Sequence, residues 1–484
     1  MDVRRLPLPE ERPRVIEPTW ISLLPPVLAI VLAIWSRQVY LSLAGGIWLG
    51  WTILEGWNPL AGLAAAIEGV IAVLGSAGDA KVILFTLVIG ALIATIEAAG
   101  GFRGFVHALE RKEWVDSARK SQLLAWATGV VIFIESNITV LVAGSVARPL
   151  FDRYRCSREK LAYIIDSTSA PICILIPMNA WGAYNLGILE SLGVENALGV
   201  FLNSIVLNFY AIAAVLLVLA VIVWGIDVGP MRKAEERTRR GELLWPDATP
   251  MIDEDVLSSE PKEGFPARAR NMIVPIASMV VFMPVSLYIT GDGSLIAGSG
   301  STSVLWSVLF GLAVAWIMLL AQRGYTQDEL VRLALKGAGG LVPLALILVL
   351  ALALGAVVQL LGTGVYVAQV TAGTMPTAVY LPLVFLVSGG IAFSTGTSWG
   401  TFAIMLPIAV PAAEALGLPL APFVAASLAG GIFGDHCSPI SDTTIISSMA
   451  AATDHIDHVR TQLPYALIGG GIAAVAFGIL GASL

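Results

Sequence analysis

Residues 421–449 are apolar except for a polar segment in their middle, GDHCSPISD at positions 434–442. A similar segment, DSTSAP at positions 166–171, interrupts the apolar residues 161–181. Each segment has an aspartate, a serine three residues later and a proline close behind. Backbone that leaves a helix at membrane depth must be buried in protein or line a cavity, because lipid cannot satisfy its N–H and C=O groups. The two stretches therefore predict two broken helices with candidate sites at the breaks.

The composition places these segments in a membrane protein. The chain has 484 residues, of which 57% are hydrophobic and 13% charged, and its mean hydropathy is +0.82. A soluble domain carries about 25% charged residues, so this chain lacks the polar surface of a water-soluble globule. The composition also excludes a disordered chain and a collagen-like rod, and three scattered cysteines exclude a disulfide scaffold. We therefore predict an all-α polytopic membrane protein.

Hydrophobic runs near the length that crosses a bilayer, about 20 residues, recur along the chain. The clear runs occupy residues 20–35, 39–54, 81–99, 198–224, 271–290, 303–320, 341–361 and 462–484. A weaker run, 60–79, contains Glu68, whose role the sequence leaves undetermined. Together with the interrupted stretches, the pattern predicts about 11 spans.

Two further apolar stretches have polar tips and predict re-entrant hairpins. The first, 121–150, is interrupted by ESN at 135–137, and the second, 377–415, by STGTS at 394–398. Cytoplasmic loops of membrane proteins are enriched in Lys and Arg. Basic residues cluster on both sides of the first hairpin, whereas residues 337–459 contain none. The first hairpin is therefore predicted to enter from the cytoplasm and the second from outside.

The same parts thus occur in two halves of opposite orientation, which predicts an inverted-repeat secondary transporter with its site at the membrane midplane. The halves are residues 20–225 and 271–484, joined by a cytoplasmic linker, 226–270. The linker has ten acidic and eight basic residues and is predicted to be solvated. Residues 1–19 are predicted to be a cytoplasmic tail, which puts the C-terminus outside a plasma or inner membrane.

Acidic residues inside the apolar stretches are the leading candidates for function. A carboxylate at the centre of a membrane helix costs about 2.5–3.5 kcal/mol, so a cation, a proton or a fixed partner must offset it. Neutral oxygens surround these carboxylates, and hard cations prefer oxygen ligands. We predict a Na⁺ site at Asp435, Ser438 and Thr397. The full set of predicted ion- or substrate-binding residues is Ser136, Asn137, Asp166, Ser169, Thr395, Thr397, Ser398, Asp435, Ser438, Asp442 and Thr443. The alternative is that these Asp and Ser residues only cap broken helices.

Four more residues could add to this site or regulate it. Glu135, at the first hairpin tip, is either a cation ligand or a residue that holds the tip in place. His436 is a further candidate, but a transition-metal site is not expected, because only Cys437 lies near it and zinc needs at least three protein ligands. His455 and His458 lie three residues apart, and a pH-sensing role for them stays open.

The sequence GDHCSPISDTT at 434–444, continued by DHIDHVRTQLPY at 454–465, resembles the NhaC-type sodium/proton antiporter family of the ion transporter superfamily. FSTGTSWGT at 393–401 is similar to the second hairpin of that family. The resemblance implies paired hairpins, broken helices and Na⁺/H⁺ antiport. Carboxylate carriers of the superfamily have Ser-Asn-Thr tips. Here the first tip reads SNIT (136–139) and the second TGT (395–397), so that pattern is half present.

Two transport functions follow, and an enzyme is not expected. The leading hypothesis is a sodium/proton antiporter that works by alternating access, with Na⁺ and H⁺ competing for one midplane carboxylate. The alternative is a Na⁺- or H⁺-coupled carrier of a small organic solute, such as a carboxylate or an amino acid, lined by Asn137 and by Trp181 or Trp399. The aspartate pair Asp166 and Asp435 resembles that of intramembrane proteases, but its repetition in both halves favours a transporter. The expected partners are the lipid bilayer, Na⁺ and H⁺, with no nucleic acid and no cofactor, and a homodimer stays open.

Overall fold

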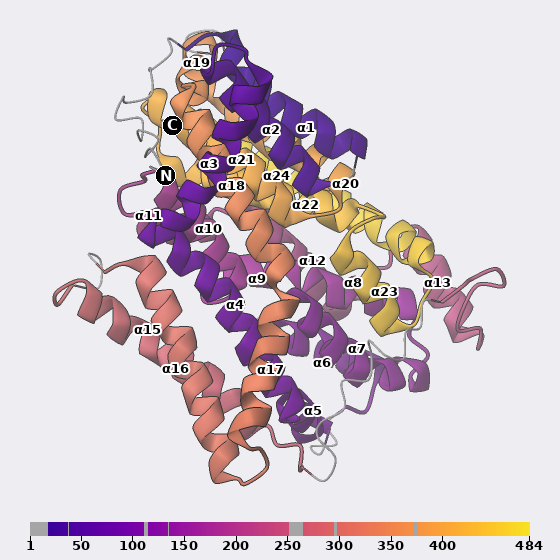
Figure 1. The fold of residues 1–484 in the computed structure, drawn as a ribbon. Coiled ribbons are helices and arrows are strands. Elements are labelled where there is room, and N and C mark those ends of the chain that lie inside the picture. The colour runs from indigo at the N-terminus through magenta and orange to yellow at the C-terminus, as the bar shows by residue number, and fades with distance from the viewer. Residues whose placement is uncertain are drawn as a thin grey trace.

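In the computed structural model, the secondary-structure elements of the described residues are all helices (Figure 1). The described residues are 18–36, 38–110, 115–133, 135–250, 265–294, 298–371 and 375–484. Most of the predicted N-terminal tail and part of the predicted linker lie outside them.

The helices follow one another with short connections. Their bounds are η1 Trp20–Leu23, α1 Leu24–Ser36, α2 Val39–Leu54, α3 Pro59–Gly75, α4 Ala77–Ala98, α5 Gly101–Glu110, α6 Ala118–Val131, α7 Ser136–Arg153, α8 Arg158–Ser167, α9 Ala170–Leu175, α10 Ala180–Ser191, α11 Ala197–Val206, α12 Phe209–Trp224, α13 Pro230–Arg239, α15 Arg270–Thr290, α16 Gly300–Ala321, α17 Gln327–Gly340, α18 Val342–Leu360, α19 Thr363–Thr371, α20 Thr377–Thr395, α21 Ser398–Ala415, α22 Leu420–Cys437, α23 Asp442–Ala451 and α24 His455–Ala482.

Seven helical segments of the described chain are long and apolar enough to cross a membrane. They are α4, α11 with α12, α15, α16, α18, α20 and α24. Large apolar side chains on these segments stay exposed, such as Val281, Ile317 and Val475. This is the surface expected of helices that face lipid, and the predicted all-helical membrane protein is confirmed.

Helices α17 and α18 run nearly end to end, since only Leu341 separates them, and they serve as a reference along the molecule (Figure 1). Helix α2 packs along α18, with Gly50 against Val357. Helix α4 instead packs along α17, with Gly90 against Gly337. Helices α3 and α4 together therefore make one net passage from the α18 end to the α17 end of the molecule.

This passage differs from the sequence prediction, which gave residues 60–79 and 81–99 a span each. The reason is that α3 turns by 119° from α2 and leads into α4. As a consequence, the first described residues lie at the same end of the molecule as the C-terminus (Figure 1), with Pro18 beside Gly362. The sequence predicted the two termini on opposite faces.

Two helix pairs lie at the positions of the predicted hairpins. Helices α6 and α7 form the first pair, and the hydroxyl of Tyr154 donates to the Val115 carbonyl across its base at 3.0 Å. Helices α20 and α21 form the second pair, and Gly396 makes the turn with a φ of 67°, a conformation that favours glycine. Figure 1 shows α6 and α7 toward the end that carries α5 and α13, and α19 at the opposite end.

The predicted broken helices end where their polar segments begin. Helix α8 stops at Ser167, and α9 restarts with Pro171 in its first turn, where a proline fits because its missing N–H has no helical partner. Helix α10 follows after a further bend of 40°. Helix α22 stops at Cys437, and Ser438 has an extended backbone ahead of α23.

The first part of the linker is only partly solvated, whereas the prediction was a solvated segment: α13 exposes one face and buries the other. Helix α13 packs on the start of α8, where Arg237 makes a buried ion pair with Glu159 at 2.8 Å. Lys160 pairs with Asp227 at 2.8 Å in the same region. Charge counts alone predict a solvated segment, because they do not show that its charges have buried partners in another helix.

Candidate functional site

The end of α22 carries Asp435, which is the first carboxylate of the site. Its Oδ2 accepts a hydrogen bond of 2.7 Å from Ser398 Oγ, the first residue of α21. Its Oδ1 is buried and accepts no hydrogen bond from the described residues. The break at residues 438–441 and the second hairpin tip therefore meet at this carboxylate, as the sequence predicted from separate polar segments.

The end of α8 carries Asp166, which is the second carboxylate. Its Oδ2 accepts hydrogen bonds from Thr444 Oγ1 at 3.1 Å and from Gln462 Nε2 at 2.7 Å. Its Oδ1 is also buried and without a partner. Donors from α23 and α24 thus hold a carboxylate that belongs to the other half of the chain.

His436 lies between the two halves and is buried. Its Nε2 is 3.1 Å from Ser167 Oγ and 3.7 Å from Asp166 Oδ2, and its Nδ1 is 2.8 Å from Tyr210 OH. Gln462 also donates to the His436 carbonyl at 2.8 Å. One ring and one amide therefore connect the break after α22 to the break after α8.

Both hairpin tips are tied to the polar segments through a backbone carbonyl. Ser438 Oγ donates to the Phe393 carbonyl at 2.7 Å, and Asn179 Nδ2 donates to the Phe133 carbonyl at 3.0 Å. Phe133 and Phe393 precede the two tips at corresponding positions of the halves. In the first tip, the buried Oδ1 of Asn137 has no partner.

Other predicted residues have local hydrogen bonds. Ser169 Oγ donates to the Asp166 carbonyl at 2.8 Å, Thr395 Oγ1 to the Ile391 carbonyl at 2.9 Å, and Ser136 Oγ to Glu135 Oε1 at 3.2 Å. Thr443 Oγ1 lies 3.0 Å from Ser441 Oγ. An N-cap side chain instead accepts a hydrogen bond from a backbone N–H, so these contacts are not N-cap hydrogen bonds, and Ser169 makes none at the start of α9. Thr397 is half-buried at the N-cap of α21, without a capping hydrogen bond from its side chain.

Asp442 differs from the other two aspartates because its side chain is exposed. It begins α23 and lies near enough to Asp435 for their charges to interact, and so does Asp166.

The carboxylates of the site are paired with neutral donors. Among the described residues, no Lys or Arg forms an ion pair with Asp435 or Asp166. A buried charge needs a partner, and each carboxylate has one free oxygen. Carboxylate and hydroxyl oxygens without a fixed cation can take up a small hard cation or a proton.

Two aromatic residues that the sequence singled out lie together beside the second tip. The rings of Trp181 and Trp399 are 4.5 Å apart, and Tyr184 donates to the Trp399 carbonyl at 3.0 Å. Trp181 Nε1 is buried without a partner. The packing joins α10 to α21.

Four residues of the site were not predicted from the sequence: Tyr210, Asn179, Thr444 and Gln462. Tyr210 and Gln462 come from helices distant in sequence from Asp166, whereas Thr444 is close to Asp442 in α23 and Asn179 follows α9. For Gln462 a signal existed, because it is a polar residue in an apolar helix and lies one turn after His458, on the same face. The others look like ordinary cap or helix residues.

Comparison with known proteins agrees with this architecture. Residues 173–482 match the model of the Na⁺/H⁺ antiporter family. An uncharacterized protein of Haemophilus influenzae is 33% identical over 95% of this chain and 90% of its own length. The arginine/ornithine antiporter ArcD of Halobacterium salinarum is 30% identical over 43% of this chain and 41% of its own. The malate-2H⁺/Na⁺-lactate antiporter of Bacillus subtilis is 32% identical over 36% of this chain and 38% of its own.

Two solved transporters share the fold. The YdaH transporter of Alcanivorax borkumensis superposes with a TM-score of 0.59, covering 93% of this chain and 98% of its own at 14% identity. MtrF of Neisseria gonorrhoeae, from a class of antimetabolite efflux pumps, gives a TM-score of 0.55 over 86% of this chain and 84% of its own, also at 14% identity. The family and these relatives are transporters rather than enzymes. The chain belongs to the Na⁺/H⁺ antiporter family.

Proposed function

We propose that the protein exchanges Na⁺ for H⁺ and that the two ions compete for Asp435. The observation that carries this proposal is the buried Oδ1 of Asp435, which has no partner although its Oδ2 is hydrogen-bonded to Ser398. A carboxylate held in this way at a helix break can bind Na⁺ when ionised and a proton when not. Thr397 and Ser438 are the candidates for further neutral oxygen ligands in this proposal.

Competition for one carboxylate is sufficient for exchange. When Na⁺ leaves toward one side, a proton replaces it, because an unpaired charge at this depth is costly. Alternating access then requires the parts that meet at the site to move relative to each other. Hydrogen bonds at the Phe133 and Phe393 carbonyls join the tips of α6–α7 and α20–α21 to this region.

The test is Na⁺-driven pH change inside proteoliposomes that contain the full-length protein. Asp435→Asn keeps the shape of the side chain but cannot ionise, so we expect it to abolish Na⁺-driven proton movement. In the wild type, lower pH should weaken the apparent affinity for Na⁺. Asp292→Asn, at an exposed position just after α15, is the control and should exchange normally. Normal exchange by Asp435→Asn would contradict the proposal.

A second candidate function is coupled transport of a small organic solute. The relatives whose names include arginine, ornithine, malate and lactate favour it, as do the unpartnered Asn137 Oδ1 and Trp181 Nε1. Adding amino acids or carboxylates to the same proteoliposomes distinguishes the two functions. Na⁺-driven proton movement that appears only with an added solute would favour the second.

A further inference from the structure

Three of the four histidines of the chain lie near the buried carboxylates. His436 contacts the site directly, whereas His455 and His458 lie in the first turns of α24. His458 is fully buried, and its Nε2 is 4.0 Å from Asp166 Oδ2. His455 is half-buried at the start of the helix. Ser448, in the last turn of α23, joins the two rings, with its Oγ 3.0 Å from His455 Nδ1 and 2.9 Å from His458 Nδ1.

The hydrogen-bond partners of Gln462 determine where neutral His458 carries its hydrogen. The amide nitrogen of Gln462 faces the Asp166 carboxylate and the His436 carbonyl, which are both acceptors. Its Oε1 must therefore be the atom that lies 2.9 Å from His458 Nε2. An amide oxygen only accepts hydrogen bonds, so His458 carries a hydrogen on Nε2. Neutral His458 then has a bare Nδ1 facing Ser448.

The same reasoning applies to His455. Its Nε2 is 2.6 Å from the Pro439 carbonyl, which can only accept, so Nε2 carries a hydrogen. Neutral His455 would therefore also present a bare Nδ1 to Ser448.

The hydroxyl of Ser448 cannot satisfy both rings. It has one hydrogen and faces two Nδ1 atoms as well as the Thr444 carbonyl at 2.8 Å. With both rings neutral, at least one Nδ1 lone pair faces an oxygen lone pair. One additional proton removes this conflict, because a ring with both nitrogens protonated donates to the Ser448 oxygen.

We propose that His455, Ser448 and His458 form a proton-binding site that relays protons between the linker side of the protein and Asp166. When a proton moves from His455 toward Asp166, His455 Nδ1–H passes its proton to Ser448 Oγ while the Ser448 hydroxyl proton moves to His458 Nδ1. The Nε2 proton of His458, which faces Gln462 Oε1 at 2.9 Å, must then turn toward Asp166 Oδ2 at 4.0 Å, and its transfer makes Asp166 a carboxylic acid. His455 is left neutral, and His458 is left neutral with its hydrogen on Nδ1. The use of these protons in Na⁺/H⁺ exchange rests on the proposed antiport, whereas the proton-binding site itself does not.

Two helix ends meet at the relay. Ser448 lies at the C-terminal end of α23, where the helix dipole favours a cation, whereas His455 begins α24, where the dipole opposes one. Asp454 and Asp457 flank His455 on α24, Arg460 lies one turn further on, and Asp166 and His436 face His458.

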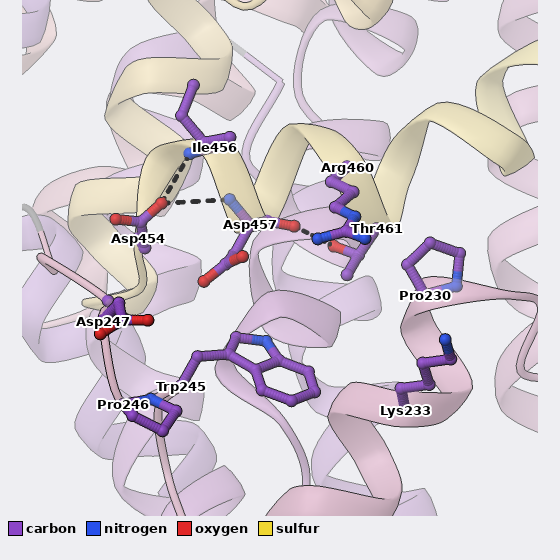
Figure 2. A pocket seen from close by; sticks show the side chains of 11 residues that line it. Pro230, Lys233, Trp245, Pro246, Asp247, Asp454, Ile456, Asp457, Arg460 and Thr461 are labelled. Carbon is purple, nitrogen blue, oxygen red and sulfur yellow. Dashed lines mark hydrogen bonds between the residues drawn. The ribbon is translucent and has the colours of Figure 1, made fainter.

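The His455 end of the relay lies next to a pocket. Asp454 and Ile456, the two neighbours of His455 in sequence, line a pocket of about 490 Å³ between α24 and the linker (Figure 2). Figure 2 also shows Trp245 of the linker opposite Asp457. This is where water can supply protons to His455.

The proton site can be tested without transport, by nitrogen NMR of the full-length protein labelled at histidine in liposomes. Near neutral pH we expect one of His455 and His458 to be doubly protonated and the other to be neutral with its hydrogen on Nε2. His455→Gln and His458→Gln assign the signals. In Ser448→Ala the protonation of one ring should no longer depend on that of the other. Ser448→Thr, which keeps the hydroxyl, should restore this dependence. Two neutral rings between about pH 8 and about pH 5 would overturn the proposal.

The relay is tested by comparing two activities of the same proteoliposomes. In His458→Gln and Ser448→Ala, Na⁺-driven proton movement should fall at least about tenfold, whereas Na⁺/Na⁺ counterflow, which moves no proton, should be unchanged. Ser204→Ala removes a buried hydroxyl that donates only within α11 and is the control. An equal loss of counterflow, or unchanged proton movement, would overturn the relay. If the wild type moves no protons with Na⁺ but the NMR signals are as expected, the proton site stands and the proposed antiport fails.

Discussion

Ser398 is the residue whose side chain bears most directly on the Asp435 carboxylate. Its hydroxyl stabilises the ionised form by a 2.7 Å hydrogen bond, and such bonds to charged groups contribute about 1.5–3 kcal/mol. Ser398→Ala should therefore favour the protonated carboxylate. Because protons then compete better, we expect the half-saturating Na⁺ concentration for exchange to rise at least about tenfold at fixed pH.

A matched control for this change is a serine of α22, two turns before Asp435. Ser427 is equally buried, but its hydroxyl donates only to the Phe423 carbonyl within the helix. Ser427→Ala should leave the Na⁺ dependence of exchange unchanged. The same shift in both variants would show that the effect is one of packing rather than of the hydrogen bond to Asp435.

Single residues of the site differ in how far the sequence predicts them. Asp435 and Ser398 were expected together, because a carboxylate and a hydroxyl tip in apolar surroundings both need a polar partner. Gln462 and Tyr210 were not, since their role depends on which helices the fold brings to Asp166 and His436. A polar residue in apolar surroundings must have a polar partner, but the tertiary packing decides which residue that partner is.

Helix α13 is the element whose contacts most clearly exceed its sequence pattern. Its Arg237 pairs with Glu159 of α8, and both side chains are buried. Arg237→Met would leave the Glu159 charge buried and unpaired, which costs about 3–5 kcal/mol. We expect a marked fall in the melting temperature of the purified protein in detergent. Arg239→Met, at an exposed position two residues later, should change the melting temperature little; equal effects would contradict the role of the buried pair.

A second contact of the linker, at the start of α24, depends on pH. Partial burial alone would raise the pKa of Asp454, but hydrogen bonds from Thr249 and from the backbone of Asp457 and Ile456 hold that pKa below its ordinary value. Such a carboxylate stabilises the folded state above its unfolded pKa, about 3.9, and loses that contribution as the pH falls through the folded value. Asn can still cap the helix, so Asp454→Asn isolates the effect of the charge.

The expected result is a pH-dependent difference in melting temperature. The wild type should melt above Asp454→Asn near neutral pH, and the difference should shrink once the pH falls below about 3.9. Thermal unfolding at a series of pH values measures it. A difference that stays constant down to acid pH would mean that the carboxylate charge is not its cause.

At the scale of the whole molecule, the sequence predicts the class of fold better than the path of the chain. Apolar length and polar interruptions predict spans, hairpins and broken helices, because each reflects a local need to satisfy backbone or charge in lipid. The direction of α3 is different. Its sequence is apolar and of spanning length, so nothing local shows that it turns after α2 and joins α4 in one net passage. That single turn decides on which side the first helix begins.

The side of the N-terminal region can therefore be determined by cysteine labelling in intact cells. Thr19 and Ser483 are exposed and lie at one end of the molecule, and Glu236 of α13 is exposed at the other. With a membrane-impermeant maleimide, Thr19→Cys and Ser483→Cys should label from the same side and Glu236→Cys from the opposite side. The three native cysteines are buried, so the wild type should give little background. If Thr19→Cys instead labels with Glu236→Cys, residues 60–79 and 81–99 cross separately, and the chain path from α1 to α4 is wrong.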